Sequence, residues 1–310
     1  MQKTTPYKKP ILDGEYVNVY IPKPGVYEGN KSVHFSPGEF YGDWVPNDFT
    51  VTRDAAGFVH IIGITHPRPP SFRDSFNFDE TAHDAEHQLF HCVSPSPSIG
   101  GCLYEGSFRE EEKLLWAPLR PNEQPECWAP CLYKKGDGDY YLFYSPRDMR
   151  LARTADLYSY TFNPPLFRGG PMMRDPFVIE DGGEYHMIYL EDCLLARRSK
   201  DLVNWSAPET FQKNPFGGVS AQESPFVFVR DGAYYLTWCI HDGTNGCYDN
   251  RTFVFVSDSL YGFDGKAPIA MLPGHAPEFV NEGDDWYIVS VYYPKNGINI
   301  ARLRFVSEEY

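Results

Sequence analysis

The hydrophobic pattern of the chain repeats one unit of two short strands. Each copy has an apolar stretch, a turn rich in Gly and Asp, and then an aromatic-rich stretch, which is typical of two antiparallel strands joined by a tight turn. Four clear copies cover 128–144, 174–189, 223–238 and 275–290, and a weaker copy covers 46–62. A proline near the start of each clear copy recurs at spacings of 46, 49 and 52 residues. The chain therefore contains five copies of one unit.

Each clear copy continues into further strands. A third apolar stretch follows at 149–153, 194–197, 252–256 and 298–302. After three of them a phrase beginning at Asp156, Asp201 or Ser259 leads to an outer strand. Four antiparallel strands in every copy are the signature of a propeller blade. We therefore predict an all-β fold, a five-bladed β-propeller with four-stranded antiparallel blades, formed as a single domain by residues 1–310. A β-sandwich is the alternative, but it gives no reason for one phrase to recur.

Composition agrees with many short strands. The 310 residues include 26 Gly and 27 Pro, and 16% of them are aromatic. This combination favours strands and turns over a helical bundle. The seven cysteines show no zinc-ribbon or CxxC spacing, which indicates unpaired thiols in a reducing compartment. Local disulfides between Cys92 and Cys102, or between Cys239 and Cys247, are the alternative.

Charge and apolar runs disfavour two classes of partner. The net charge is −14, from 28 basic and 42 acidic residues, and such a field repels nucleic acid and anionic membranes. No apolar run is long enough for a spanning helix, and the N-terminal residues lack the apolar core of a signal peptide. We expect no nucleic-acid or membrane partner. We also expect a cytoplasmic protein, or a periplasmic or secreted one whose signal has been removed.

Propeller geometry brings distant residues together. The first strand of every blade lines the central channel, and all first strands begin on the same face. The residues at these starts should therefore form a ring around one channel mouth: Asn47, Asp48, Glu126, Trp128, Arg174, Asp175, Glu223 and His275. The ends of the second strands should form a second ring, which includes Asp192 and His241. We expect Asn47, Trp128, Arg174, Asp192 and His241 to bind substrate.

Three carboxylates of the first ring suit the cleavage of a glycosidic bond. That reaction needs one carboxyl group that protonates the leaving oxygen and a second that activates water or attacks the anomeric carbon. A third carboxylate can keep the acid protonated, because crowded negative charge raises a carboxyl pKa. Asp48, Asp175 and Glu223 match this requirement in number and position. Asp before Pro is also a common turn starter, which is a structural explanation for Asp175, whereas Glu223 has no such explanation.

Aromatic and histidine residues add to the prediction. Trp128 offers an apolar face for a sugar ring, and His275 is placed to bind a metal ion or water. A long insertion in the first copy, with Phe72, Phe76 and Phe78, is a candidate cap for a pocket that holds one terminal sugar. No phosphate-binding loop, dinucleotide fingerprint, nucleophile elbow or HExxH motif is present.

At these residues the sequence resembles the five-bladed β-propeller glycoside hydrolases, closest to family 43 and its relatives in families 62, 32 and 68. The resemblance covers about 45–305 and is carried by the starts of the repeated units. The matching phrases are Trp128-Ala-Pro, Arg174-Asp-Pro, Glu223-Ser-Pro and Gly274-His275. One departure is Cys131, which stands where family 43 usually has Asp.

The resemblance implies a role for each matched residue. Asp48 would be the base of an inverting enzyme or the nucleophile of a retaining one, Asp175 would tune the acid, and Glu223 would be the general acid. His275 would lie beside a central metal ion, often calcium. The expected activity is removal of a terminal, furanosidic sugar from an oligo- or polysaccharide, with no organic cofactor. A carbohydrate-binding propeller without catalysis is the alternative that Cys131 favours, and a protein-interaction propeller is a weaker one.

Overall fold

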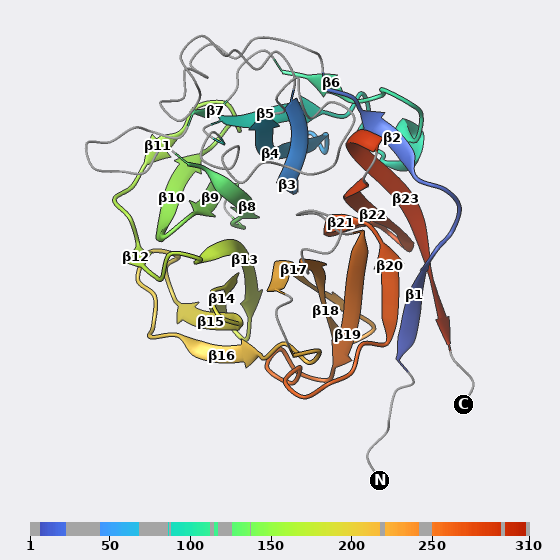
Figure 1. Cartoon of the computed structure of the whole chain (residues 1–310). Helices are drawn as coiled ribbons and strands as arrows, with labels where there is room; N and C mark the ends of the chain where they lie inside the picture. The colour runs from blue at the N-terminus through green and yellow to red at the C-terminus, as the bar shows by residue number, and fades with distance from the viewer. Residues whose placement is uncertain are drawn as a thin grey trace.

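Five antiparallel sheets surround a central axis in the computed structural model, which describes residues 7–22, 44–67, 86, 88–111, 115–116, 126–136, 138–217, 221–241, 250–292 and 295–307 (Figure 1). In each sheet a path of four hydrogen-bonded strands runs from the centre outward. This confirms the prediction of a five-bladed propeller with four-stranded antiparallel blades. The repeated phrases at 128–144, 174–189, 223–238 and 275–290 form the two inner strands of blades two to five.

The strands of each blade follow one another along the chain. Blade one contains β3 (Trp44–Arg53), β4 (Val59–Pro67), β5 (Gln88–Val93), β6 (Arg109–Glu110) and β7 (Leu115–Trp116). Blade two contains β8 (Trp128–Lys134), β9 (Tyr140–Ser145), β10 (Asp148–Thr154), β11 (Thr161–Phe162) and β12 (Phe167–Arg168). Blade three contains β13 (Arg174–Asp181), β14 (Glu184–Leu190), β15 (Leu194–Ser199) and β16 (Glu209–Gln212).

The last two blades complete the ring. Blade four contains β17 (Ala221–Arg230), β18 (Ala233–His241), β19 (Arg251–Ser257) and β20 (Ala270–Pro273). Blade five contains β21 (His275–Glu282), β22 (Asp285–Tyr292) and β23 (Lys295–Ser307) from the C-terminal part of the chain. Its outer strands β1 (Lys8–Leu12) and β2 (Val17–Tyr20) come from the N-terminal part and pair with β23. The sequence pattern did not reveal this closure, because the two partners lie at opposite ends of the chain.

The core consists of five apolar clusters, one between each pair of neighbouring blades. The aromatic residues of the second strands fill these spaces. Trp238, for example, is fully buried between blades three and four, and its ring stacks on Phe255 at a centroid distance of 5.3 Å. Blade packing therefore explains why each copy of the repeat has an aromatic second strand.

A β-bulge interrupts the innermost strand of every blade, where the ladder skips two residues. In blades two to five the second skipped residue is proline, whose missing N–H is tolerated where the ladder is broken. The first skipped residue has a positive φ of 41° at Ala129, 59° at Asp175, 50° at Ser224 and 47° at Ala276. In blade one the proline position is occupied by Asp48. The shared X-Pro phrase thus marks a backbone irregularity that all five blades place around the channel.

The Asp-Leu phrase marks a tight turn between the third and outer strands. Oδ1 of Asp201 accepts hydrogen bonds from the N–H groups of Val203 and Asn204, at 2.9 and 2.7 Å. Asp156 accepts equivalent bonds in blade two. In both turns the following leucine has a φ of 66° and is buried, as Leu202 shows. The phrase therefore fixes the position where the chain bends back toward the blade edge.

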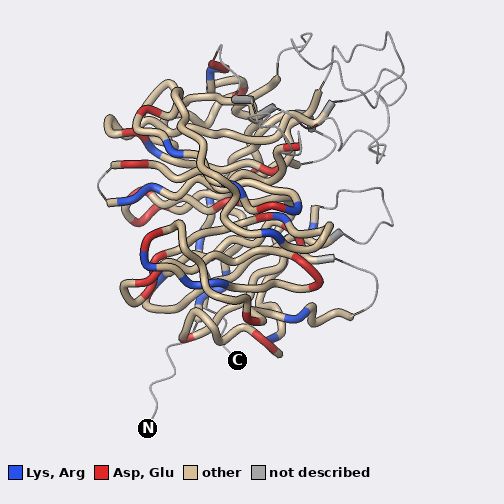
Figure 2. The backbone as a smooth tube through the Cα atoms, turned by 90° about the vertical axis from the view of Figure 1, so that its left-hand side faces the viewer, with Lys and Arg blue, Asp and Glu red and all other residues tan. Residues whose placement is uncertain are grey.

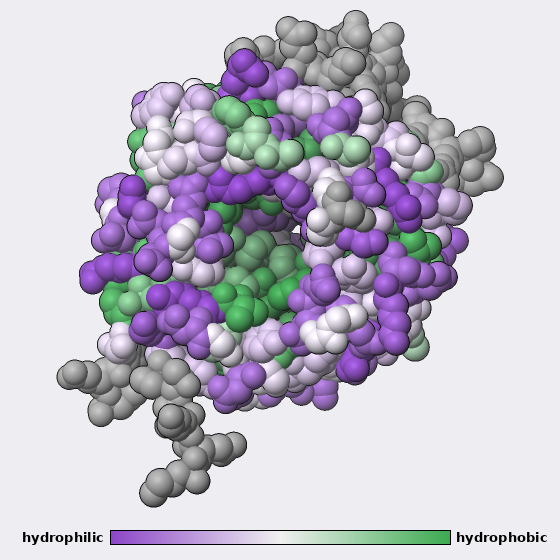
Figure 3. Space-filling model, turned by 180° about the vertical axis from the view of Figure 1, so that it is seen from behind, coloured by the Kyte–Doolittle hydropathy of each residue, from purple (hydrophilic) through white to green (hydrophobic). Residues whose placement is uncertain are grey.

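Other sequence predictions can be compared with the described residues. Cys92, Cys102, Cys127, Cys131, Cys193 and Cys239 all carry free thiols, so a Cys92–Cys102 disulfide is wrong, while Cys247 lies outside the described residues. Among the described residues, no helix is long and apolar enough to cross a membrane. Basic and acidic residues are interspersed along the described backbone (Figure 2). From behind, a central hollow has hydrophobic walls and a largely hydrophilic rim (Figure 3).

Candidate active site

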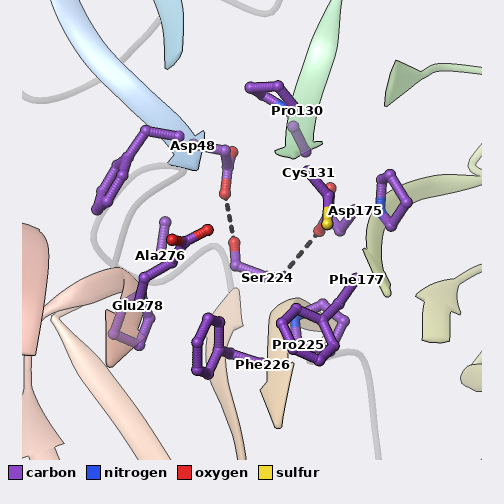
Figure 4. Close-up of a pocket in the computed structure, with 14 residues that line it drawn as sticks. Asp48, Pro130, Cys131, Asp175, Phe177, Ser224, Pro225, Phe226, Ala276 and Glu278 are labelled. Carbon is purple, nitrogen blue, oxygen red and sulfur yellow. Dashed lines mark hydrogen bonds between the residues drawn. The ribbon is translucent and has the colours of Figure 1, made fainter. Parts of the chain in front are cut away.

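Three blades bring the predicted carboxylates to one place in the channel. Asp48 comes from β3, Asp175 from β13 and Glu223 from β17. Ser224 links them, because its hydroxyl donates to Oδ1 of Asp48 and its backbone N–H donates to Oδ2 of Asp175 at 3.0 Å (Figure 4). The pocket around Ser224 is lined by bulge residues of all five blades. Residues separated by up to 176 positions thus share one hydrogen-bonded cluster.

Arg174 contacts two carboxylates of the cluster, those of Glu223 and Asp175. Its Nη2 lies 2.9 Å from Oε1 of Glu223, and its Nε lies 3.7 Å from Oδ2 of Asp175. The Arg174 side chain is only 12% exposed. Burial by itself lowers the pKa of Arg174, but the charges of Asp175 and Glu223 outweigh it and raise that pKa above its usual value. Arg174 therefore remains a cation between two carboxyl groups.

Burial and crowded negative charge change the acidity of the aspartates. Burial raises the pKa of Asp175 to about 8; Arg174 opposes this shift, while Asp48 and Glu223 add to it. Burial also raises the pKa of Asp48, against the effect of His275, and the charge of Glu223 adds to the increase. Asp175 is therefore predominantly protonated at neutral pH. Groups whose environments shift their pKa values are frequent at functional sites, although structural clusters produce shifts as well.

The two oxygens of Glu223 have different environments. Oε1 accepts the hydrogen bond from Arg174. Oε2 is buried and has no hydrogen-bond partner among the described residues. Arg174 thus fixes Oε1, while Oε2 can still form a hydrogen bond. This arrangement suits a carboxyl group that donates a proton to a bound ligand.

The other predicted ring residues lie near the same face. Asn47 is buried in the bulge of β3, at the position that Asp175 holds in β13. Trp128 begins β8 and is partly buried against the cluster between blades one and two. Asp192 is exposed just beyond the end of β14, whose Leu190 pairs with Arg174. His241 ends β18 opposite Ala221, but its side chain and the insertion with Phe72, Phe76 and Phe78 lie outside the described residues.

Sequence reasoning missed two residues of this pocket. Ser224 was recognised only as part of a repeated phrase, yet it connects Asp48 to Asp175. Glu278 of β21 points its carboxyl group into the same pocket (Figure 4) and accepts a hydrogen bond from the N–H of Val51 at 2.5 Å. Burial raises the pKa of Glu278 to about 8. The available signal was its register, since Glu278 occupies the position that Phe177 holds in blade three and Phe226 in blade four.

His275 is fully buried at the start of β21, close to two other potential ligands. One ligand atom each of Glu223, Cys239 and His275 lies within 4.8 Å of the others. Calcium takes six to eight oxygen ligands, whereas this set offers one carboxylate oxygen, one sulfur and one imidazole nitrogen. The described residues around His275 therefore do not fit the calcium ion that the sequence resemblance implied.

Comparison with known proteins shows similarity in fold. No protein-family model and no curated protein matches the sequence. A solved exo-1,5-α-L-arabinanase from a bovine ruminal metagenomic library has a TM-score of 0.61 at 14% identity, covering 86% of this chain and 97% of its own. A GH43_1 enzyme from Xanthomonas citri complexed with xylose has a TM-score of 0.58 at 14% identity, covering 84% and 87%. The catalytic domain of a Coprinopsis cinerea GH62 α-L-arabinofuranosidase has a TM-score of 0.57 at 13% identity, covering 93% and 96%. The chain thus shares its five-bladed propeller fold with solved structures of families 43 and 62.

Proposed function

We propose that the protein is a glycoside hydrolase that removes a terminal, furanosidic sugar from an oligo- or polysaccharide. The convergence of Asp48, Asp175 and Glu223 around Ser224 carries this proposal. The three residues lie on different blades, and Asp175 and Glu223 are largely buried. Buried charge is costly to a fold unless it is paired or used. The structural similarity to an arabinanase and an arabinofuranosidase supports the proposal at the level of the fold.

Each residue has a defined part in the proposed reaction. Glu223 donates a proton from Oε2 to the leaving glycosidic oxygen while Arg174 holds Oε1 in place. Asp48 accepts the proton of the attacking water, or attacks the anomeric carbon itself, and Ser224 orients its carboxylate. Asp175 orients the Ser224 backbone by accepting its N–H, and so holds the bulge that carries Glu223 and Ser224 in place.

The test is a turnover assay with carboxylate variants. Aryl furanosides and fructans are incubated with the wild type, Glu223→Gln and Asp48→Asn. Loss of the general acid is expected to lower kcat by about 10²–10⁴-fold, with the smallest loss on substrates that have a good leaving group. Loss of Asp48 is expected to lower the rate for all leaving groups alike. Proton NMR of the first released anomer distinguishes inversion from retention.

Matched controls separate catalysis from binding. Glu209→Gln changes an exposed carboxylate on β16 and is expected to leave turnover unchanged. If both active-site variants hydrolyse substrate at the wild-type rate, the proposed mechanism is wrong. If calorimetry shows oligosaccharide binding by the wild type but long incubation gives no product, the protein is a carbohydrate-binding propeller instead.

A further inference from the structure

We propose that Glu223, Cys239 and His275 form a site for a zinc-type divalent cation, and that an ion bound there inhibits the enzyme. The three side chains come from β17, β18 and β21, at the junction of blades four and five. Their ligand atoms lie within 4.8 Å of one another. The inhibitory effect rests on the proposed glycosidase function, whereas metal binding itself does not.

The donor set selects the class of metal. A carboxylate oxygen, a cysteine sulfur and an imidazole nitrogen are the ligands that zinc takes in proteins, whereas calcium and magnesium require oxygen ligands. Zinc sites with three protein ligands keep a fourth position for water. Zinc bond lengths place neighbouring ligand atoms about 3.4–3.8 Å apart, so the cluster needs only a small contraction to close around the ion.

The backbone around Cys239 holds its sulfur in position. Cys239 lies opposite Glu223 in the ladder of blade four, and its thiol donates to the Glu223 carbonyl oxygen at 3.5 Å. The N–H of Ala276 donates to the same sulfur at 3.4 Å. This N–H favours the thiolate form, while burial and the carboxylate of Glu223 raise the pKa of Cys239 well above its usual value. Because Ala276 follows His275 directly, the same bulge places both the imidazole and the hydrogen-bond donor.

The ion would compete directly with catalysis. Oε2 of Glu223 is buried and has no hydrogen-bond partner among the described residues, so it is available as a ligand. It is also the oxygen assigned to proton donation. A cation on Oε2 displaces the proton that the leaving group needs. Its positive charge would also attract the Asp48 carboxylate, which interacts with Glu223 and His275. Zinc should therefore lower kcat, and adding substrate should not restore it fully.

The test measures zinc binding by calorimetry in the wild type and in Cys239→Ser. The wild type is expected to bind one Zn²⁺ per chain, with no competition from Ca²⁺ in excess. Removal of the sulfur should weaken binding by at least about 100-fold, which is the upper range for loss of a supporting group around a metal ligand. The matched control is the double variant Cys193→Ser with Cys247→Ser, which should bind as the wild type does. Cys193 is the most accessible thiol among the described residues.

Further measurements keep the outcome decisive. If Cys239→Ser fails to fold, Glu223→Gln replaces it in the binding assay, and Cd²⁺ added to the control double variant should produce the absorption of a cadmium–thiolate bond. Zinc should inhibit turnover by the wild type but not by Cys239→Ser. Equal zinc affinity with and without the Cys239 sulfur, no binding at all, or displacement by Ca²⁺ would overturn the proposal. Zinc binding by a protein without turnover would uphold the site and reject the glycosidase function.

Discussion

Buried carboxyl groups dominate the channel at the scale of single residues. Asp175 and Glu278 lie in the same pocket, and burial raises the pKa of each to about 8. At neutral pH both carboxyl groups are therefore mostly protonated. Glu278 accepts hydrogen bonds from the Val51 N–H and the Thr50 hydroxyl, so its neutral carboxyl group is anchored without a cation. The channel thus concentrates acidic side chains while limiting the charge that it must bury.

These raised pKa values predict how stability depends on pH. Between about 4.5 and 8 the Glu278 carboxyl is protonated in the folded chain but ionised in the unfolded chain, so the free energy of unfolding falls as pH rises. In Glu278→Gln this contribution is absent, and the fall in Tm between pH 5 and pH 8 should become shallower. Asp175 keeps part of the slope, since its shift has the same sign. Thermal unfolding at several pH values measures the effect, and an unchanged slope would contradict it.

Bulges and turns determine how each blade is built at the scale of the element. The inner-strand bulge is present in all five blades although its residues differ. It places Ser224 so that one residue contacts carboxylates from two other blades. The Asp-Leu turn is the second recurring device. The Asp201 carboxylate accepts hydrogen bonds from two backbone N–H groups and from the side-chain amide of Asn204. These hydrogen bonds lower the pKa of Asp201 and stabilise the turn.

Removal of the turn carboxylate should destabilise blade three. Asp201→Ala loses the acceptor for Val203 and Asn204, and the free energy of unfolding is expected to fall by about 1 kcal/mol, as for other solvent-accessible hydrogen bonds. Urea unfolding followed by tryptophan fluorescence measures the change. Lys200→Ala, next to the turn, is the control and should stay within about 0.5 kcal/mol of the wild type. A larger loss in the control would show that the turn depends on something other than the carboxylate.

The ring is closed by the N-terminal strand at the scale of the whole molecule. β1 pairs with β23 from Lys8 to Leu12 and forms the outer edge of blade five. The hydroxyl of Tyr235, in blade four, donates to the carbonyl oxygen of Lys8 at 2.9 Å. β1 therefore connects blades four and five, and it pairs the N-terminal part of the chain with the C-terminal strand β23. Without it the outer edge of β23 would expose unpaired backbone N–H and C=O groups.

Deletion of residues 1–12 should therefore weaken the whole ring. The variant loses the five ladder pairs of β1, and we expect the free energy of unfolding to fall by about 1–5 kcal/mol on the basis of cross-strand pair energies. Differential scanning calorimetry compares it with a chain that lacks only residues 1–6, upstream of β1, which should unfold near the wild-type temperature. Equal melting of the two truncated chains would show that β1 does not hold the ring.

The repeated phrases were sufficient to predict blade number and the ring of strand starts, because both depend on local signals. Proline, Gly-Asp turns and aromatic strands recur at the four clear copies, and repeated four-stranded units of this length are typical of propeller blades arranged in a ring. Asp175 and Glu223 were found in this way, since they precede a proline or lie two residues before one in the inner-strand phrase. Blade one was harder to align, because Asp48 replaces that proline.

Contacts that depend on long-range packing could not be found from the sequence. The closure by β1 joins the two ends of the chain, and nothing local to either end indicates it. Glu278 replaces a phenylalanine in a copy of the phrase, but only the folded channel shows that its carboxyl group accepts a hydrogen bond from the Val51 N–H. Cys239 sits in an ordinary aromatic strand, and its closeness to Glu223 and His275 depends on cross-strand register and blade packing.

The sequence by itself determined the class of fold, the number of blades and which acidic residues lie in the inner-strand phrases, because these follow from a local pattern that recurs along the chain. Tertiary structure alone decided which side chains meet: Ser224 between Asp48 and Asp175, Arg174 against Glu223, and Cys239 beside His275. The physical reason is that these contacts cross blades. Their distances depend on the bulges and on the packing of five apolar interfaces, and no local stretch of sequence encodes either.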